Sequence, residues 1–413
     1  MATSRNVSVS AHETGVGLRQ PIRPFSLREW TAWVRSWAYP AGSRRDLRID
    51  FLRGFCVFAM IVDHIGGDSW LYLFTGGNRF FVSAAEGFVF ISGLVMGQAY
   101  ARKIATEGLP EAMLEALRRA RKLYLTTVTL TLFFVALYLF TNANLWVDRS
   151  TGLGVEAIDE LIVGTLTLHF TYNGTDILNM YTILILASPL LFLLLSFGAG
   201  RGVLIGSWLL WWAYQHFPAQ AAIPWPIANS VAFPVAAWQV LFVSGLTLGY
   251  HRDHVANFLC RLPRIRVLIA FVAAAIWLIV LSLFWVEETQ RTVMFLGFNA
   301  GPDNLSEAFE KVQLRPGRLM AFAALGILSY VLTTIAWKPI SSAFGWLLLP
   351  LGQNALYAYI MHFFFILLIY NVHPESIVEG APASVTGTLL HMATIVLLWW
   401  MVKRELLFRW VPR

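Results

Sequence analysis

The sequence has little charge and almost no cysteine. Only 13% of its 413 residues are Asp, Glu, Lys or Arg, about half the share found in soluble domains. This scarcity argues against soluble enzymes and nucleic-acid-binding proteins. The two cysteines, Cys56 and Cys260, lie far apart in the sequence and cannot form a disulfide framework or a metal cluster. We therefore expect neither a secreted disulfide scaffold nor a metal site.

Apolar and aromatic residues are abundant instead. The chain is 57% hydrophobic and contains 17 Trp and 30 Phe, with a mean hydropathy of +0.60. This composition is typical of an integral membrane protein. The formal net charge of +7 is then explained by membrane topology rather than by nucleic-acid binding. Residues 1–48 are polar and rich in Arg, so we expect no cleavable signal peptide.

Ten apolar segments approach the length of about 20 residues that a transmembrane helix requires. The sequence therefore predicts an all-α polytopic membrane protein with about ten transmembrane helices. The predicted helices cover residues 49–66, 80–100, 122–141, 176–198, 201–217, 230–250, 265–286, 318–337, 345–370 and 384–402.

The basic residues outside these helices predict their orientation. Lys and Arg are concentrated in the N-terminal segment, in the even-numbered connections and after residue 402, and such segments stay in the cytoplasm. Both termini are therefore expected to be cytoplasmic. Three regions follow: a basic segment 1–48 with an amphipathic interfacial helix at about 26–38, the ten-helix domain 49–402, and a basic tail 403–413.

Two residues of the first predicted helix are candidates for chemistry. Arg53 and His64 are eleven residues apart, which places them on one helix face with an axial separation of roughly 16 Å. Ionisable residues inside a membrane usually face a cavity or a partner. A cytoplasmic anionic cofactor with a long arm would fit this separation. In the structural alternative, Arg53 pairs with Asp50 and His64 is satisfied by Asp63.

The second predicted helix carries a carboxylate at a similar depth. Glu86 lies about two turns into this helix, level with His64. A carboxylate in this place would orient an imidazole base and stabilise its charged form. A structural ion pair of Glu86 with Arg79, or with a residue of another helix, explains it equally well.

The ninth predicted helix carries a further histidine. Tyr359 and His362 share one face of it, and Tyr357 lies on the adjacent face. His362 is explained as well by helix packing as by ligand binding. Before the fourth helix lies a polar segment typical of a carbohydrate-binding rim, although single polar loop residues are usually only solvated. Its members are His169, Tyr172, Asn173, Asp176 and Asn179.

These residues together resemble the OpgC family. The similar segments are Asp50 to Gly54 with Asp63 and His64, Ala85 to Gly93, Asp176 to Tyr181, and Leu314 to Arg318. The members of this family are bacterial inner-membrane proteins that succinylate osmoregulated periplasmic glucans, and they belong to the wider transmembrane acyltransferases. Arg53 with ten residues before His64 matches the Arg/His motif of that group's first helix. The resemblance spans roughly residues 45–405.

The resemblance implies acyl transfer from cytoplasmic acyl-CoA, expected to be succinyl-CoA, to a hydroxyl of a periplasmic glucan. His64 would act as the general base, and no Ser or Cys has a convincing base partner for an acyl-enzyme. The expected neighbours of the base are Asp63 and Glu86. The residues expected to bind the donor are Arg53, Asp50, Tyr357 and His362. The residues expected to bind the substrate on the outer side are Arg79, His169, Asn173, Asp176, Asn179, Arg315 and Arg318. Of these, Arg79, Arg315 or Arg318 would bind the free carboxylate of a succinyl group.

No tightly bound cofactor is expected beside the acyl-CoA co-substrate. The expected partners are the glucan and membrane lipids, not nucleic acid, and a homo-oligomer is left open. Two other functions stay open: O-acetyl transfer to another cell-envelope polysaccharide, and secondary transport, since intramembrane Arg, His and Glu also mark ion pathways. The hydropathy shows no convincing inverted repeat, which argues against a transporter. A non-catalytic scaffold would leave Arg53 and His64 unexplained.

Overall fold

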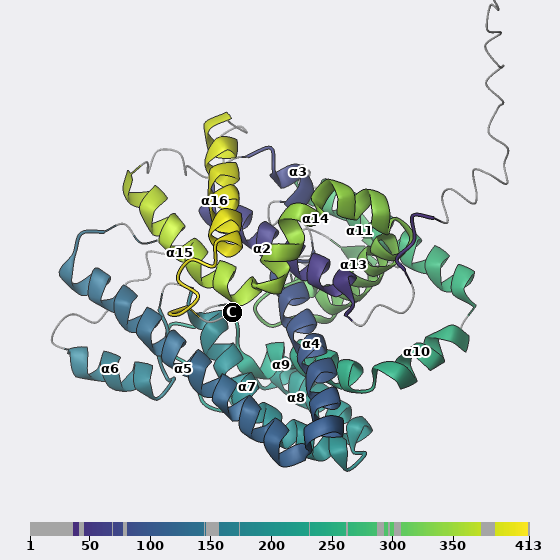
Figure 1. Cartoon of the computed structure of the whole chain (residues 1–413), viewed down its shortest axis with the longest axis horizontal. Coiled ribbons are helices and arrows are strands. Elements are labelled where there is room, and N and C mark those ends of the chain that lie inside the picture. Colours follow the sequence, from purple (N-terminus) through teal and green to yellow (C-terminus); the bar gives the residue numbers. More distant parts are fainter. Residues whose placement is uncertain are drawn as a thin grey trace, which may run out of the picture.

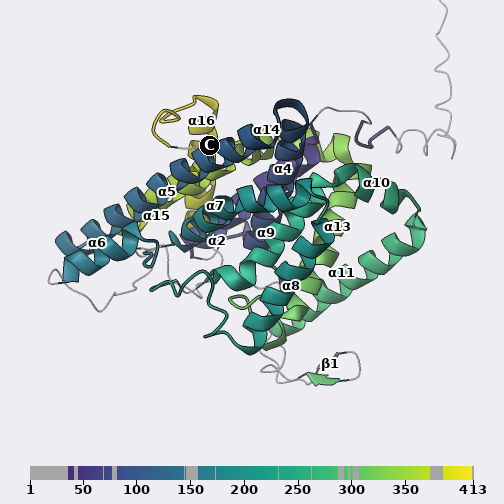
Figure 2. The ribbon, with the colours of Figure 1, turned by 90° about the horizontal axis from the view of Figure 1, so that it is seen from below.

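In the computed structural model the chain forms a bundle of long helices (Figure 1) with one small pair of antiparallel strands beside it (Figure 2). The long helices are α2 (Leu47–Ile65), α4 (Ala84–Glu107), α5 (Leu109–Phe140), α7 (Asp176–Ser196), α8 (Gly200–His216), α9 (Val235–Tyr250), α11 (Arg264–Val286), α13 (Pro316–Ile335), α14 (Trp337–Gln353), α15 (Ala355–Val372) and α16 (Val385–Lys403). The short elements are α3 (Tyr72–Thr75), α6 (Ile158–Leu166), α10 (Arg252–Arg261), β1 (Val293–Phe295) and β2 (Phe298–Ala300). The structure describes residues 36–40, 45–67, 69–76, 81–143, 145, 157–172, 174–230, 232–261, 263–286, 293–295, 298–300, 307–372 and 385–411.

The all-α fold class is confirmed, and each of the ten predicted segments contains a long helix. One prediction is wrong, because residues 345–370 do not form one helix. α14 begins at Trp337 and ends at Gln353, and α15 begins two residues later. The side-chain amide of Asn354 donates at 3.0 Å to the carbonyl of Pro350, which also accepts the backbone N–H of Asn354 at 3.2 Å. Asn residues that bond to nearby backbone in this way are unfavourable in helix interiors. Gly352 weakens the same turn.

Five of the described helices are long and apolar enough to cross a membrane, namely α5, α7, α13, α15 and α16. α9 and the apolar part of α11 are shorter, and α2 carries Asp50, Arg53 and Asp63. Large apolar side chains are exposed on the outer faces of several helices, among them Leu190, Leu209 and Ile269, as expected for contact with lipid. Ten crossings stay a prediction, and residues 26–35 of the predicted interfacial helix lie outside the described residues.

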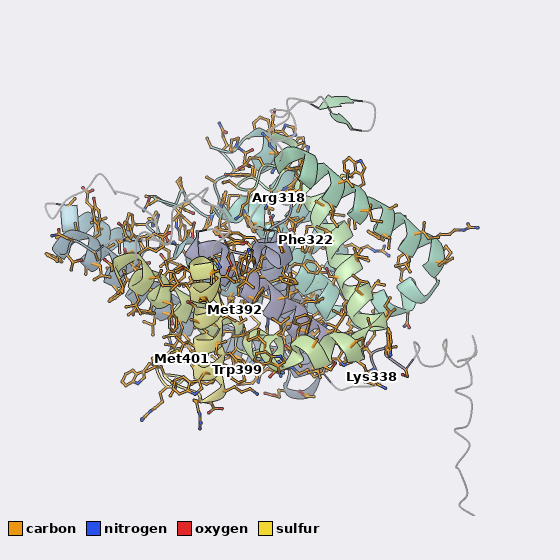
Figure 3. All side chains as sticks on the ribbon, turned by 90° about the horizontal axis from the view of Figure 1, so that it is seen from above. Arg318, Phe322, Lys338, Met392, Trp399 and Met401 are labelled. Atoms are coloured by element: carbon orange, nitrogen blue, oxygen red, sulfur yellow. The ribbon has the colours of Figure 1, made fainter. Side chains whose placement is uncertain are left out.

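Lys338, Trp399 and Met401 lie at one end of the bundle and Arg318 lies at the other (Figure 3). We call the first the basic end. There the backbone N–H of Lys338 donates to the carbonyl of Trp37 at 2.9 Å, so the first and last described residues lie at the same end. The cytoplasmic location of this end stays a prediction from its positive charge.

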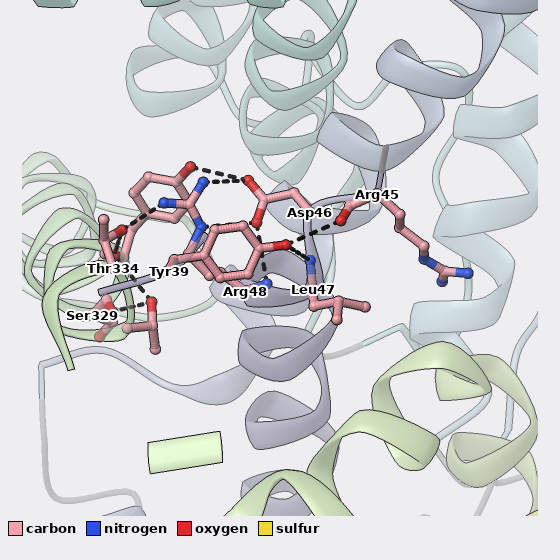
Figure 4. A network of polar contacts seen from close by, with 9 residues as sticks. Tyr39, Arg45, Asp46, Leu47, Arg48, Ser329 and Thr334 are labelled. Atoms are coloured by element: carbon pink, nitrogen blue, oxygen red, sulfur yellow. Dashed lines mark hydrogen bonds and ion pairs between the residues drawn. The ribbon is translucent and has the colours of Figure 1, made fainter. Parts of the chain in front are cut away.

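A polar network at the basic end attaches the start of α2 to α13 (Figure 4). The Arg48 guanidinium lies between the rings of Tyr39 and Tyr330, 4.3 and 4.4 Å from their centroids. It also forms a bidentate pair with Asp46 and donates to Thr334 at 2.7 Å. Burial raises the pKa of Asp46, but hydrogen bonds and charge from Arg48 outweigh it and hold this pKa below its ordinary value. The network fixes where α2 begins.

Glycine allows α4 and α9 to touch through their backbones. Gly93 and Gly97 of α4 are four residues apart, as are Gly245 and Gly249 of α9. A Cβ built on Gly93 would lie 2.2 Å from the carbonyl oxygen of Phe242. Each of the other three would lie equally close to a carbonyl of the facing helix. This reciprocal pattern is typical of helix pairs in membranes.

A second backbone contact joins α2 to α14. A Cβ on Gly54 would lie 2.0 Å from the Leu348 carbonyl oxygen, and a Cβ on Gly352 would lie 1.8 Å from the Asp50 carbonyl oxygen. No side chain larger than hydrogen fits at either position without separating the helices. α2 also contacts α4, α13, α15 and α16, so this central helix is positioned from all sides.

The substitution Gly54→Ala should therefore separate α2 from α14 and lower the thermal denaturation midpoint of the detergent-solubilised protein. The expected cost is about 1–3 kcal/mol, as for other overpacked interiors. Gly206→Ala in α8 is the matched control, because its Cβ would meet nothing within 4 Å. Alanine is the better helix former by about 1 kcal/mol, so the midpoint of the control should stay equal or rise. Equal midpoints for the two variants would contradict the contact.

Candidate active site

Two histidines from α2 and α15 meet inside the bundle. Nδ1 of His64 and Nε2 of His362 are 2.9 Å apart. His362 is fully buried, whereas His64 keeps partial exposure. Phe363 and the Tyr359 ring pack against both imidazoles. Tyr359 and His362, which the sequence places on one helix face, are therefore in contact, and the two imidazoles are held by aromatic neighbours.

The hydrogen bonds of this pair determine which nitrogens carry protons. Nδ1 of His362 lies against the backbone carbonyl oxygen of Tyr359, and a carbonyl can only accept. In the neutral ring, Nδ1 of His362 is therefore the donor and Nε2 is the acceptor. Nδ1 of His64 must then donate to His362. This assignment makes Nε2 of His64 the basic nitrogen.

Tyr359 ties this part of α15 to the segment before α7. Its hydroxyl donates to the carbonyl of Gly174 at 3.1 Å, and its ring stacks beside Phe88 of α4. The hydroxyl is thus engaged by backbone rather than by either histidine. The role of Tyr359 in the geometry is to hold the turn of α15 whose carbonyl orients His362.

Arg53 lies on the same face of α2 as His64, nearer the basic end. Its Nε donates to the carbonyl of Gly352 at 2.6 Å, and its Nη2 approaches Asp50 at 3.4 Å. Gly352 lies in the last turn of α14, where carbonyls lack helical partners and the helix dipole is negative. Arg53 therefore caps α14. Its Nη1 makes no hydrogen bond within the described part of the chain.

Two further arginines lie near Arg53. Arg45 forms an ion pair with Asp50, with 2.6 Å between Nε and Oδ2, and both Arg45 and Arg119 interact electrostatically with Arg53. Arg119 comes from α5 and is exposed. Sequence reasoning missed its relation to Arg53, because no spacing links residues of different helices. The three cations form what we call the arginine cluster of the basic end.

Of the two alternatives for Glu86, the structure has the ion pair with a residue of another helix, and not the contact with His64. The Glu86 carboxylate forms a buried ion pair with Arg318 of α13 and also accepts from the backbone N–H and hydroxyl of Ser83. These Ser83 contacts form a capping box at the start of α4. Arg318 also donates to the Phe309 carbonyl at 3.2 Å. Glu86 and Arg318 thus join α4 to α13, and Arg318 is already engaged by a carboxylate.

Two other predicted site residues have different partners from those expected. Asp63 accepts a hydrogen bond from the Thr75 hydroxyl at 3.2 Å and is not the partner of the His64 Nδ1 atom. Tyr357 donates to the carbonyl of Leu406 at 2.7 Å and attaches α15 to the C-terminal segment at the basic end. Each of these polar groups therefore stabilises a local connection.

The predicted polar rim is only partly present. His169 is exposed and stacks on Trp225 with 4.9 Å between ring centroids. Asp176 and Asn179 are buried instead, and Asn179 donates to the Leu168 carbonyl at 3.4 Å. Both belong to the first turn of α7, which packs inward. Arg79 and Asn173 lie outside the described residues.

Lys311 is a site residue that the sequence did not single out. It lies in the loop before α13 and interacts electrostatically with Asp63, His64 and Glu86. No periodicity marks a residue in an irregular loop, so only the fold reveals this proximity. Among the described residues, no group of three or more His, Cys, Asp or Glu side chains is arranged to hold a metal ion.

The Glu86–Arg318 pair leads to a prediction about stability. Glu86→Gln leaves a buried guanidinium uncompensated, which typically costs about 3–5 kcal/mol, and the thermal midpoint should fall. The double variant Glu86→Gln/Arg318→Met removes both charges and should recover part of the loss. Glu107→Gln is the control, because Glu107 pairs with Lys103 on the exposed surface and such pairs contribute little. If the stability loss of the double variant equalled the sum of the losses of the two single variants, the pairing would be contradicted.

The family model described as OpgC protein matches residues 45–406. No curated protein and no solved structure is similar enough to match. The match covers nearly the whole described helical bundle, including both histidines and the arginine cluster. It confirms the resemblance that the sequence motifs indicate: the chain belongs to the OpgC family.

Proposed function

We propose that this protein transfers a succinyl group from cytoplasmic succinyl-CoA to a hydroxyl of an osmoregulated periplasmic glucan, as a multi-pass protein of the inner membrane. Membership of the OpgC family implies the coarser statement, an acyltransferase that acts on these glucans. The observation that supports the finer proposal most is the hydrogen-bond chain from the Tyr359 carbonyl through His362 to His64.

In the proposed reaction His64 is the general base. Nε2 of His64 takes the proton from the glucan hydroxyl, whose oxygen attacks the thioester carbonyl carbon. The carbon–sulfur bond then breaks, and the leaving thiolate takes the proton from His64 and departs as CoA thiol. His362 does not touch the substrate. It holds the donor proton of His64 on Nδ1, so that the lone pair lies on Nε2.

The arginine cluster is the proposed site for the phosphates of CoA. Arginine suits phosphate because its planar guanidinium offers several donors. Arg45, Arg53 and Arg119 lie at the basic end, and His64 lies roughly 16 Å further along α2. The pantetheine arm would follow this face of α2 to bring the thioester to His64. The anionic head group would stay at the basic end, because charge is costly inside the bilayer.

His64→Ala is the direct test of this function. In sealed proteoliposomes with one protein orientation, labelled succinyl-CoA on the basic-end side and glucan on the other side should give labelled glucan. The variant should lose about 10²–10⁴-fold in transfer rate, the usual scale of general base catalysis.

His254→Ala is the matched control, because His254 is an exposed residue of α10. Its transfer rate should equal that of the unmodified protein. Near-normal turnover in His64→Ala, or the absence of transfer in the unmodified protein, would disprove the proposed function. Transfer with both substrates confined to one side would disprove the transmembrane arrangement.

Arg53→Met separates donor binding from helix capping. If the Nη1 atom of Arg53 binds donor phosphate, the Kd for succinyl-CoA measured by calorimetry should rise at least tenfold, on the scale of a lost charge-assisted hydrogen bond. Loss of the cap on α14 should also lower the thermal midpoint. Arg201→Met, at an exposed position of α8, should change neither quantity. A lower midpoint with unchanged Kd would show that Arg53 acts only as a cap.

A further inference from the structure

The loop that carries Lys311 is fixed to the bundle by its backbone. Three side chains of α8 and α9 donate to three successive carbonyls of the loop. These bonds are Trp238 Nε1 to Val312 at 3.0 Å, Gln215 Nε2 to Gln313 at 2.7 Å, and Trp211 Nε1 to Leu314 at 3.0 Å. A loop held by buried aromatic donors has a defined position, so the place of its side chains is also defined.

The loop is stabilised from within as well. The Glu310 carboxylate accepts from the backbone N–H groups of Val312 and Gln313 at 2.8 and 2.7 Å. Leu314 is fully buried and has a positive φ of 50°, a strained conformation that persists only where surroundings enforce it. Lys311 therefore projects from a rigid turn.

Lys311 lies among acidic groups near His64. The charged groups that interact with it are Glu86, Arg318, Asp63 and Asp176. Burial lowers the pKa of Lys311 below its ordinary value, and the nearby carboxylates oppose this effect. Its ammonium makes no hydrogen bond within the described part of the chain. An additional carboxylate oxygen at hydrogen-bond distance would stabilise the charged form of this partly buried cation.

Of the other two described cations of this region, Arg318 is firmly engaged and Arg315 is only loosely paired. Arg318 pairs with Glu86 and donates to the Phe309 carbonyl. Arg315 lies 3.8 Å from the exposed Glu307 carboxylate, and its Nε is buried without a hydrogen-bond partner among the described residues. Of the three candidates that sequence reasoning named for a succinyl carboxylate, Arg79 lies outside the described residues. Of the three described cations, Lys311 is the one whose charge acts on His64, so it is the described cation best placed to bind an anion beside His64.

The position of Lys311 also agrees with the path of the donor. Arg53 lies towards the basic end and His64 towards the other end of α2, where Lys311 precedes α13. A thioester at His64 would therefore direct its acyl group away from Arg53 and towards Lys311. In a succinyl group the terminal carboxylate carbon lies three bonds, or roughly 4 Å, beyond the thioester carbonyl. Lys311 lies two residues after Phe309, whose carbonyl accepts from Arg318 at 3.2 Å, and the charge of Lys311 also acts on His64.

We infer that Lys311 binds the terminal carboxylate of a dicarboxylic acyl group, and that this contact selects succinyl over neutral acyl donors. The inference rests on the proposed function and adds a specificity-determining residue to it. A neutral four-carbon acyl group would leave the ammonium without a hydrogen-bond partner in a partly buried place, which is how a polar site rejects an apolar analogue. The site would therefore distinguish acyl donors by the charge of the acyl group rather than by its length.

The test compares succinyl-CoA with butyryl-CoA, a neutral donor of the same chain length. Lys311→Met keeps an unbranched side chain and removes the charge, so the ratio of succinyl to butyryl transfer should fall roughly 10- to 100-fold. Lys311→Arg restores the charge and should recover part of the ratio. Lys338→Met, an exposed position at the basic end, should leave the ratio unchanged.

The same two donors are also compared by equilibrium binding in the His64→Ala background, with and without Lys311→Met. If Lys311→Met loses the preference for succinyl-CoA in binding, the inference is supported, whether or not the unmodified protein transfers an acyl group. An absence of transfer by the unmodified protein would refute only the proposed function. Transfer by the unmodified protein with an unchanged ratio in Lys311→Met would overturn the inference alone. An equal loss with both donors would also overturn it, because a structural role predicts no discrimination.

Discussion

The backbone contact between α2 and α14 at Gly54 and Gly352 determines the geometry of the site. Because neither residue has a side chain, the two helices come close enough for Arg53 to reach the Gly352 carbonyl. Helix α14 then ends at Gln353, and α15 starts beside α2. His362 lies about two turns into α15, which brings it level with His64. A larger residue at either glycine would displace both the arginine and the histidine contacts.

The charged side chains of the bundle form two groups that are separated along α2. At the basic end, arginines from three segments remain partly exposed and face the side predicted to be cytoplasmic. At the other end, the Glu86–Arg318 pair is buried and joins α4 to α13. Removal of one partner from a buried ion pair is strongly destabilising. The pair therefore fixes the positions of α4 and α13, which lie around the histidines. The residues proposed for chemistry lie between these two groups.

Agreement between sequence and structure is best where periodicity carries the information. The apolar runs predicted the helices, and the spacing of Arg53 and His64 placed both on the face that α14 and α15 cover. The four-residue spacing of Gly93/Gly97 and of Gly245/Gly249 is visible in the sequence, but only the structure shows that these two pairs face each other. The partner of Glu86 was not readable, because Arg318 lies 232 residues away and several arginines were equally plausible partners.

The sequence by itself determined the membrane class, the positions of most of the long helices and the family, and it named Arg53 and His64 as candidates. These properties follow from composition, hydrophobic period and local motifs, which act over a few turns of one helix. Only the tertiary structure decided the partner of each polar group: His362 for His64, Gly352 for Arg53, Arg318 for Glu86, and Lys311 near the site. The physical reason is that buried polar groups take the partner that packing brings within hydrogen-bond distance, and packing between distant helices has no local signal.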